Sequence, residues 1–148
     1  MVNTNRLNVP HPVVPLGLCQ VAQSAASAGH TVDVLDLCFE RNPIDRLCES
    51  IRSFHPDAVG ITVRNLDNSD VSSPASYIDE TVDVVRAVRS STDASVVLGG
   101  PAPSIGPELY LRLTGADCVI VGEGERAFPQ LLSELLAGRT SSRRIVAQ

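Results

Sequence analysis

Short apolar runs alternate with helical segments along almost the whole chain, and this alternation restricts the fold more than any other feature. The apolar runs, which are rich in β-branched residues and predict strands, cover 31–37, 57–63, 95–99 and 117–122. The segments with apolar residues at helical spacing, which predict helices, cover 16–28, 43–54, 77–90, 107–113 and 127–137. Such an alternation with short connections is typical of an α/β protein with a parallel sheet.

The start of the chain supplies one further strand, which is short. Residues 1–5 contain two apolar residues and are interpreted as the end of this first strand. Prolines at positions 10, 12 and 15 predict an extended loop after it, and the segment 100–106 predicts another loop. Five strands favour a flavodoxin-like, Rossmann-like doubly wound sheet with strand order 2-1-3-4-5. A ligand of such a sheet lies outside the carboxyl ends of the strands.

Length and charge exclude several classes of protein. The chain has 148 residues, which is enough for one domain with a core of its own. A net charge of -5 argues against a surface for nucleic acid or for an anionic membrane. The sequence lacks both the roughly 18-residue apolar segment of a transmembrane helix and a signal-peptide pattern, so we expect a cytoplasmic protein. The four cysteines are scattered and are interpreted as thiols of a reducing compartment.

Polar and glycine-rich residues follow four of the predicted strands. Because the carboxyl ends of parallel strands share one edge of the sheet, we expect these residues to form one ligand site. Glycines let a flat ligand approach the backbone closely, and amides and hydroxyls suit neutral polar groups. Each feature also has a purely structural interpretation, as a turn or as acidic residues at a helix start. The candidate residues are Asn3, Thr4, Asn5, Thr62, Val63, Arg64, Asn65, Gly99, Gly100, Pro101, Ser104, Gly122, Glu123, Gly124 and Glu125.

The familiar motifs of nucleotide binding and of hydrolysis are missing. The sequence contains no GxGxxG after the first strand, no GxxxxGK[ST] and no GxSxG. The position after the third strand lacks the acidic cluster of a receiver domain. His11 is the one histidine near the predicted ligand edge, and it is interpreted as an exposed loop residue. We therefore assign no catalytic residue and no metal ligand.

Four blocks occur in an order that resembles a known family: PLGLCQVAQSAASAGHTVDVLDL, PDAVGITVRNLDN, VVLGGPAPS and GADCVIVGEGERAFPQLL. The sequence is similar to the N-terminal cobalamin-binding domain of cobalamin-dependent radical S-adenosylmethionine (SAM) enzymes. The resemblance implies that residues 1–138 bind cobalamin, with the candidate residues lining the corrin or its nucleotide tail. It also implies a radical SAM barrel as partner, in cis or in trans, with residues 139–148 as a tail or linker toward it. Many members of the family transfer methyl groups.

Two departures from related patterns limit what this chain is expected to do. The CxxxCxxC motif is absent, so we expect no iron–sulfur cluster in this chain and no catalysis by the chain alone. The DxHxxG loop of methionine-synthase-type domains is also absent, and DLCFER has Cys38 where that histidine would stand. We therefore expect cobalamin bound with neither its own base nor a histidine on the cobalt. The alternatives are a flavodoxin-like regulatory or interaction domain that has lost its ligand, and, less favoured, an independent small-molecule enzyme.

Overall fold

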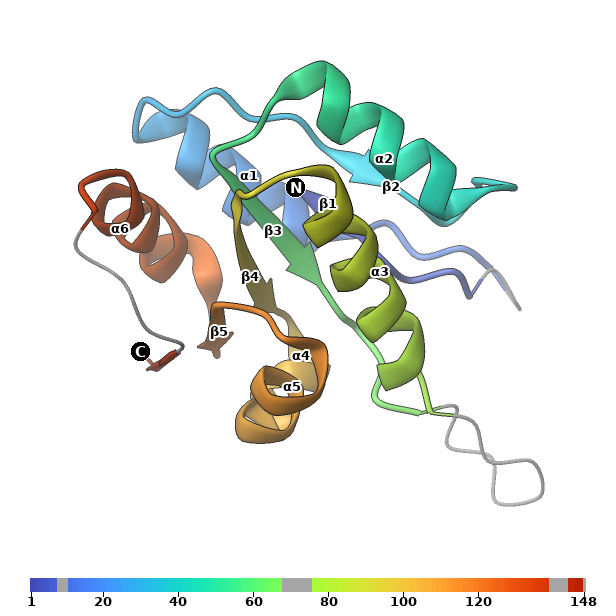
Figure 1. Cartoon of the computed structure of the whole chain (residues 1–148). Helices are drawn as coiled ribbons and strands as arrows, with labels where there is room; N and C mark the ends of the chain where they lie inside the picture. The colour runs from blue at the N-terminus through green and yellow to red at the C-terminus, as the bar shows by residue number, and fades with distance from the viewer. Residues whose placement is uncertain (8–10, 68–75, 139–143, 148) are drawn as a thin grey trace.

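The strands form one fully parallel sheet in the order β2-β1-β3-β4-β5-β6 (Figure 1). The computed structural model describes residues 1–7, 11–67, 76–138 and 144–147. The first five strands have the predicted order 2-1-3-4-5, which confirms the flavodoxin-like α/β fold. The strands are β1 (Val2–Asn3), β2 (Leu35–Asp36), β3 (Ala58–Thr62), β4 (Ser95–Gly99), β5 (Cys118–Val121) and β6 (Arg144–Ala147).

Helices cover both faces of the sheet. Helices α1 and α6 pack together on one face, and α2, α3 and α5 cover the other (Figure 1). Pro43 at the first turn begins α2, and His55 in the left-handed conformation ends it. The helices are α1 (Leu16–Ser27), α2 (Pro43–Phe54), α3 (Ile78–Ser91), α4 (Pro101–Ile105), α5 (Pro107–Thr114) and α6 (Gly124–Leu136).

Three details of the predicted elements were wrong. Residues 101–105, predicted as loop, form the short helix α4, because Gly100 turns the chain sharply and Pro101 suits a first helical turn. Strand β2 is only two residues long, because β1 offers only Val2 and Asn3 as partners. The sheet has six strands rather than five, because β6 lies within the segment predicted to be a tail or linker.

Strand β6 is the last strand of the sheet. Ile145 and Val146 pair with β5, and Arg144 forms an ion pair with Glu134 of α6. The remainder of the predicted linker, residues 139–143 and 148, lies outside the described residues.

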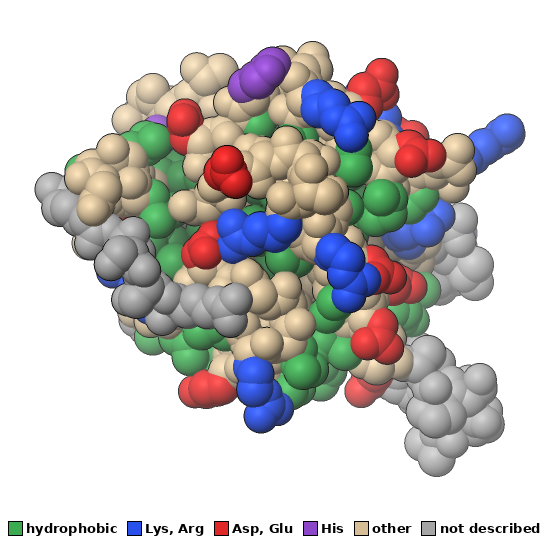
Figure 2. All heavy atoms as spheres, viewed as in Figure 1, with side chains coloured by type: hydrophobic (Ala, Val, Ile, Leu, Met, Phe, Trp, Pro, Cys, Tyr) green, Lys and Arg blue, Asp and Glu red, His purple; other side chains and the backbone are tan. Residues whose placement is uncertain are grey.

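No helix in the described ranges is long and apolar enough to cross a membrane. On the face shown in Figure 2, acidic and basic side chains are interspersed rather than gathered by sign.

Alternate residues of each central strand face two separate cores. On the side of α2, α3 and α5, the strands contribute Val59, Ile61, Val96, Leu98 and Val119. On the side of α1 and α6, they contribute Val97, Cys118 and Ile120, together with Phe128 and Leu131 of α6. On the second side, strand β3 has only the small residues Ala58, Gly60 and Thr62, so the sheet surface is low there. This asymmetry leaves room between the sheet, α1 and α6.

Asp117 links α3, β4 and the start of β5 at the amino edge of the sheet. Its Oδ2 accepts hydrogen bonds from the backbone N–H of Val96 and from Arg89 Nη2, each at 2.7 Å. Arg89 also donates to the carbonyls of Ala94 and Gly115. We expect Asp117→Ala to lower the free energy of unfolding by about 2 kcal/mol, because the buried N–H of Val96 loses a charged acceptor and the Arg89 guanidinium loses its carboxylate partner. Urea unfolding monitored by circular dichroism measures this, and a change below about 0.5 kcal/mol would contradict the assignment.

Candidate ligand site

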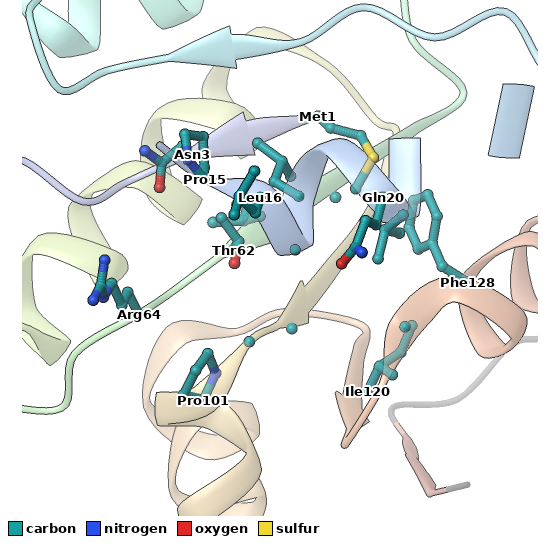
Figure 3. A pocket seen from close by; sticks show the side chains of 18 of the residues that line it. Met1, Asn3, Pro15, Leu16, Gln20, Thr62, Arg64, Pro101, Ile120 and Phe128 are labelled. Atoms are coloured by element: carbon teal, nitrogen blue, oxygen red, sulfur yellow. The ribbon is translucent and has the colours of Figure 1, made fainter. Parts of the chain in front are cut away.

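A cavity of about 750 Å³ opens at the carboxyl edge of the sheet and runs along the α1 and α6 side (Figure 3). The ends of β1, β3, β4 and β5 contribute to its wall. Most of the residues predicted from the strand ends therefore lie together. The predicted residues that line it are Asn3, Asn5, Thr62, Arg64, Gly99, Gly100, Pro101, Ser104, Gly122, Glu123, Gly124 and Glu125.

Three predicted residues do not line this cavity. Thr4, Val63 and Asn65 instead line a smaller neighbouring cavity of about 180 Å³, whose wall Asn5 and Arg64 share. The Thr4 hydroxyl donates to the carbonyl of Thr62 at 2.9 Å, and Val63 is buried in the core. The Val63 N–H donates to the carbonyl of Gly99 at 2.9 Å. Thr4 and Val63 thus hold neighbouring strand ends together instead of facing the larger cavity.

The inner end of the cavity is apolar, and the strand-end pattern did not predict it. Met1, Gly60, Val97, Ile120 and Phe128 line this part. In Figure 3, Met1, Gln20 and Phe128 lie toward one end of the cavity, away from Arg64. A Cβ atom on Gly60 would lie 3.0 Å from Phe128 Cζ and 3.2 Å from Met1 Cε. An isolated glycine in a buried strand signals such a close approach, so the sequence did contain a clue.

The loop before α1 and the first turns of α1 form another wall that the prediction missed. Val13, Val14 and Leu16 line the cavity, and Val14 and Leu16 are 66% and 68% exposed. Gln20 follows one turn later and also lines it (Figure 3). The predicted loop is confirmed for residues 11–15, which form neither helix nor strand, whereas residues 8–10, with Pro10, lie outside the described residues. Its apolar residues had no recognisable periodicity, so nothing in the sequence assigned them to a wall.

The turn between β4 and α4 requires glycine at position 100. Gly100 has φ of 102° and ψ of 179°, a combination that is open essentially only to glycine. A Cβ atom there would lie 2.8 Å from both Thr62 Oγ1 and the carbonyl oxygen of Val63. The Ala102 N–H donates to that same carbonyl at 3.2 Å. The β4–α4 turn is thus packed directly against the end of β3.

Ser104 connects two glycine turns of the site. Its hydroxyl donates to the carbonyl of Gly100 at 2.8 Å and accepts a hydrogen bond from the N–H of Gly122 at 3.1 Å. Gly100 belongs to the turn after β4 and Gly122 to the turn after β5. The hydroxyl therefore fixes the separation of the two turns.

We expect Ser104→Ala to weaken ligand binding about 5- to 10-fold, because both hydrogen bonds are lost and the β5–α6 turn is released. Ser104→Thr keeps the hydroxyl and should restore most of the affinity. Titration with the ligand, monitored by absorbance, measures both variants. Equal affinity of the alanine variant and the unchanged chain would show that the two hydrogen bonds of the Ser104 hydroxyl have no role in ligand binding.

Asn3 and Asp36 hold the carboxyl ends of β1 and β2 together. Asn3 is 2% exposed, and its Nδ2 donates to Asp36 Oδ1 at 2.8 Å. The Asn3 Oδ1 accepts from the N–H of Asn5 at 3.2 Å, and the Cys38 N–H donates to Asp36 Oδ1 at 3.0 Å. Asp36, the first residue of DLCFER, thus has a structural role in the described chain.

The walls provide hydrogen-bonding groups and apolar surface but no metal-binding cluster. Within the described ranges, no group of three or more His, Cys, Asp or Glu residues could hold a metal ion. No described residue that lines the larger cavity is a histidine. Burial raises the pKa of the Cys38 thiol, so this thiol stays neutral near pH 7. The arrangement suits a large neutral ligand with polar groups at its edge.

The family follows from comparison with known proteins. Residues 2–132 match the model of the B12 binding domain, and the chain therefore belongs to the B12-binding domain family. This confirms the predicted resemblance and the predicted class of cofactor, cobalamin.

Three curated methyltransferases are similar to this chain. It is 28% identical to tryptophan 2-C-methyltransferase of Streptomyces laurentii, with 97% of this chain and 24% of that protein covered. It is 34% identical to an uncharacterized methyltransferase of Pyrococcus horikoshii, with 84% and 25% covered. It is 32% identical to hopanoid C-3 methylase of Methylococcus capsulatus, with 82% and 22% covered. The chain spans about a quarter of the length of these relatives.

Two solved structures of the radical SAM methyltransferase TsrM from Kitasatospora setae have the same fold. The complex with tryptophan and aza-SAM matches with a TM-score of 0.88 and 30% identity, covering 95% of this chain and 26% of that chain. The complex with cobalamin and a [4Fe–4S] cluster matches with a TM-score of 0.86 and 29% identity, covering 95% and 24%. The chain is thus homologous to the cobalamin-binding region of such an enzyme.

Proposed function

We propose that this chain binds cobalamin in the cavity of about 750 Å³ and presents it to a radical SAM domain for methyl transfer. The observation that carries the proposal is the position of this cavity at the carboxyl edge of the sheet in a B12-binding domain. Ligands of doubly wound sheets bind at this edge. The volume lies within the range of about 300–1,000 Å³ that is usual for cofactor sites.

The wall residues fit the chemistry of a corrinoid. Glycines 99, 100 and 122 leave backbone accessible, so a broad flat ring can lie against the turns. The rim of a corrin carries neutral primary amides, which donate hydrogen bonds to acceptors such as Asn5, Thr62 and the carboxylates of the β5–α6 turn. The multiply charged phosphates of a nucleoside di- or triphosphate would instead be repelled by Glu123 and Glu125. The inner apolar end would take the least polar part of the ligand.

The residues of this chain have a binding and orienting role in the proposed function. The glycine turns, joined by Ser104, form a fixed support for the ring, and the apolar α1 wall excludes water from one side. When bound, cobalamin supplies the methyl-carrying chemistry, and the protein supplies burial and orientation. No wall residue is assigned a proton transfer.

A radical SAM domain is the proposed partner, in cis as in the similar methyltransferases. The matched relatives are about four times as long as the aligned region, which leaves room for further domains in those proteins. The most exposed large apolar side chains of the described chain lie in the loops or at the ends of helices that follow strands: Val14, Leu16, Phe39 and Ile105. An apolar rim at this edge suits the close approach of a second domain.

Retention of hydroxocobalamin by the purified chain tests the proposed function. The chain is incubated with an excess of hydroxocobalamin and desalted, and the visible spectrum of the protein fraction is recorded. We expect about one corrinoid for each chain. A colourless protein, both for this chain and for its fusion to a radical SAM domain of a matched relative, would contradict the proposal and favour an interaction domain without a ligand.

The lower face of the cobalt is proposed to lack a nitrogen ligand. DxHxxG is absent from the sequence, and no histidine lines the described part of the cavity. The chain loaded with cobalamin and reduced to the cobalt(II) state should therefore give an EPR spectrum without nitrogen superhyperfine splitting. Free cobalamin with its own base on the metal serves as the control for that splitting. A nitrogen pattern in the protein-bound spectrum would refute this part of the proposal.

A further inference from the structure

One carboxylate oxygen of a residue that lines the cavity is buried and has no hydrogen-bond partner among the described residues. It is Oε2 of Glu125, the second residue of α6. Buried polar atoms are nearly always hydrogen-bonded in native proteins, and an unpaired one costs free energy. A buried acceptor without a donor, in the wall of a ligand cavity, indicates that the ligand supplies the donor.

The position of Glu125 is fixed by the packing of the residue before it. A Cβ atom on Gly124 would lie 2.9 Å from Val21 Cγ2, so the first turn of α6 is in close contact with α1. This contact holds the backbone that carries Glu125 and so restricts where its side chain can reach. The unpaired oxygen is therefore a feature of a packed wall and does not belong to a free surface side chain.

Two other polar residues of the predicted site, Asn3 and Ser104, use their side-chain hydrogen-bonding groups within the protein. Asn3 is bonded to Asp36 and Asn5, and Ser104 is bonded to two glycine turns. Glu123, the other carboxylate of the β5–α6 turn, is exposed to solvent. Glu125 is thus the wall carboxylate with a buried oxygen that has no donor among the described residues.

We propose that Glu125 accepts a hydrogen bond from one primary amide on the corrin rim and makes the site selective for an amide at that position. This inference rests on the proposed function. An ionised carboxylate only accepts hydrogen bonds, so it requires an N–H donor opposite it. A carboxylate in place of that amide would bring two negative charges together and remove the donor.

Corrinoids with one rim amide hydrolysed to a carboxylate test the selectivity. The separate monocarboxylate isomers of hydroxocobalamin are titrated into the unchanged chain and into Glu125→Gln, and affinities are measured by absorbance. The unchanged chain should bind one isomer about tenfold or more weakly than intact hydroxocobalamin. In Glu125→Gln, the ratio of the affinity for intact hydroxocobalamin to the affinity for that isomer should fall by about tenfold. Intact hydroxocobalamin should also bind more weakly to Glu125→Gln than to the unchanged chain.

Glu108→Gln is the matched control, because Glu108 is likewise the second residue of its helix, α5, but does not line the cavity. It should keep the isomer preference of the unchanged chain, and both variants should change the unfolding free energy by less than about 1 kcal/mol. Glu125→Gln with unchanged affinities and unchanged isomer preference would overturn the inference and leave the proposed function standing. An unchanged chain that binds no corrinoid, either alone or fused to a radical SAM domain of a matched relative, would instead reject the proposed function itself.

Discussion

Gly60→Val is expected to reduce cobalamin binding by about 100-fold while the chain remains folded. The new Cβ atom would lie 3.0 Å from Phe128 Cζ and 3.2 Å from Met1 Cε, and the two methyl groups would enter the inner cavity. Overpacking of this kind displaces either the ligand or the wall of the cavity and costs about 1–3 kcal/mol. This corresponds to about one to two orders of magnitude in affinity for the ligand. Valine is favourable in a central strand, so the strand itself should form. Titration with hydroxocobalamin measures the loss.

Gly106→Ala is the control for this substitution. Gly106 lies outside the larger cavity, and a Cβ atom there would meet only Leu109 Cβ, at 3.7 Å. The affinity of Gly106→Ala for hydroxocobalamin should equal that of the unchanged chain. A second substitution, Phe128→Ala, should restore part of the binding to Gly60→Val by reopening space. Normal binding by Gly60→Val would show that the inner cavity is not used by the ligand.

Gly100→Ala is expected to have the largest effect on stability, about 3–5 kcal/mol. The backbone at Gly100 adopts a conformation that costs an alanine about 1–3 kcal/mol. The added Cβ atom would also contact Thr62 Oγ1 and the Val63 carbonyl oxygen at 2.8 Å, so the end of β3 must move. Urea unfolding measures the loss, and ligand affinity should fall with it, because the displaced residues form the wall.

The neighbouring Gly99 provides the comparison. Apart from its chain neighbours, no heavy atom of the described residues would lie within 4 Å of a Cβ atom on Gly99, and this residue has no positive φ. Gly99→Ala should therefore change the unfolding free energy by less than about 1 kcal/mol. Equal destabilisation by the two substitutions would contradict the account of the β4–α4 turn, because that account assigns the requirement for glycine to position 100 alone.

The strand ends were predictable because each follows a recognisable apolar run. Asp57–Val63 and Ser95–Gly99 are bounded by turn residues, so the residues that follow them could be assigned to one edge of the sheet. Strand β6 was missed because its four residues follow a charged segment and carry little pattern of their own. Helix α4 was missed because the proline-rich segment suggested a turn, whereas Gly100 redirects the chain into a helix.

The interior of the site could not be derived from local patterns. The contact between Gly60 and Phe128 joins residues far apart in the chain, and it depends on how α6 packs on β3. The hydrogen bonds of Asn3 and Ser104 likewise depend on distant partners, Asp36 and Gly122. Residue type indicated that these side chains could bind a polar ligand. Only the packed structure shows that their polar atoms hold the walls together.

The position of the cobalt atom in a crystal of the chain with hydroxocobalamin tests the central claim most directly. Anomalous scattering at the cobalt absorption edge locates this atom without reference to the rest of the ligand. We predict a single peak at the carboxyl edge of the sheet, above Thr62 at the end of β3 and the turns that contain Gly100 and Gly122. A peak at the opposite edge of the sheet, or on the side covered by α2, α3 and α5, would contradict the account.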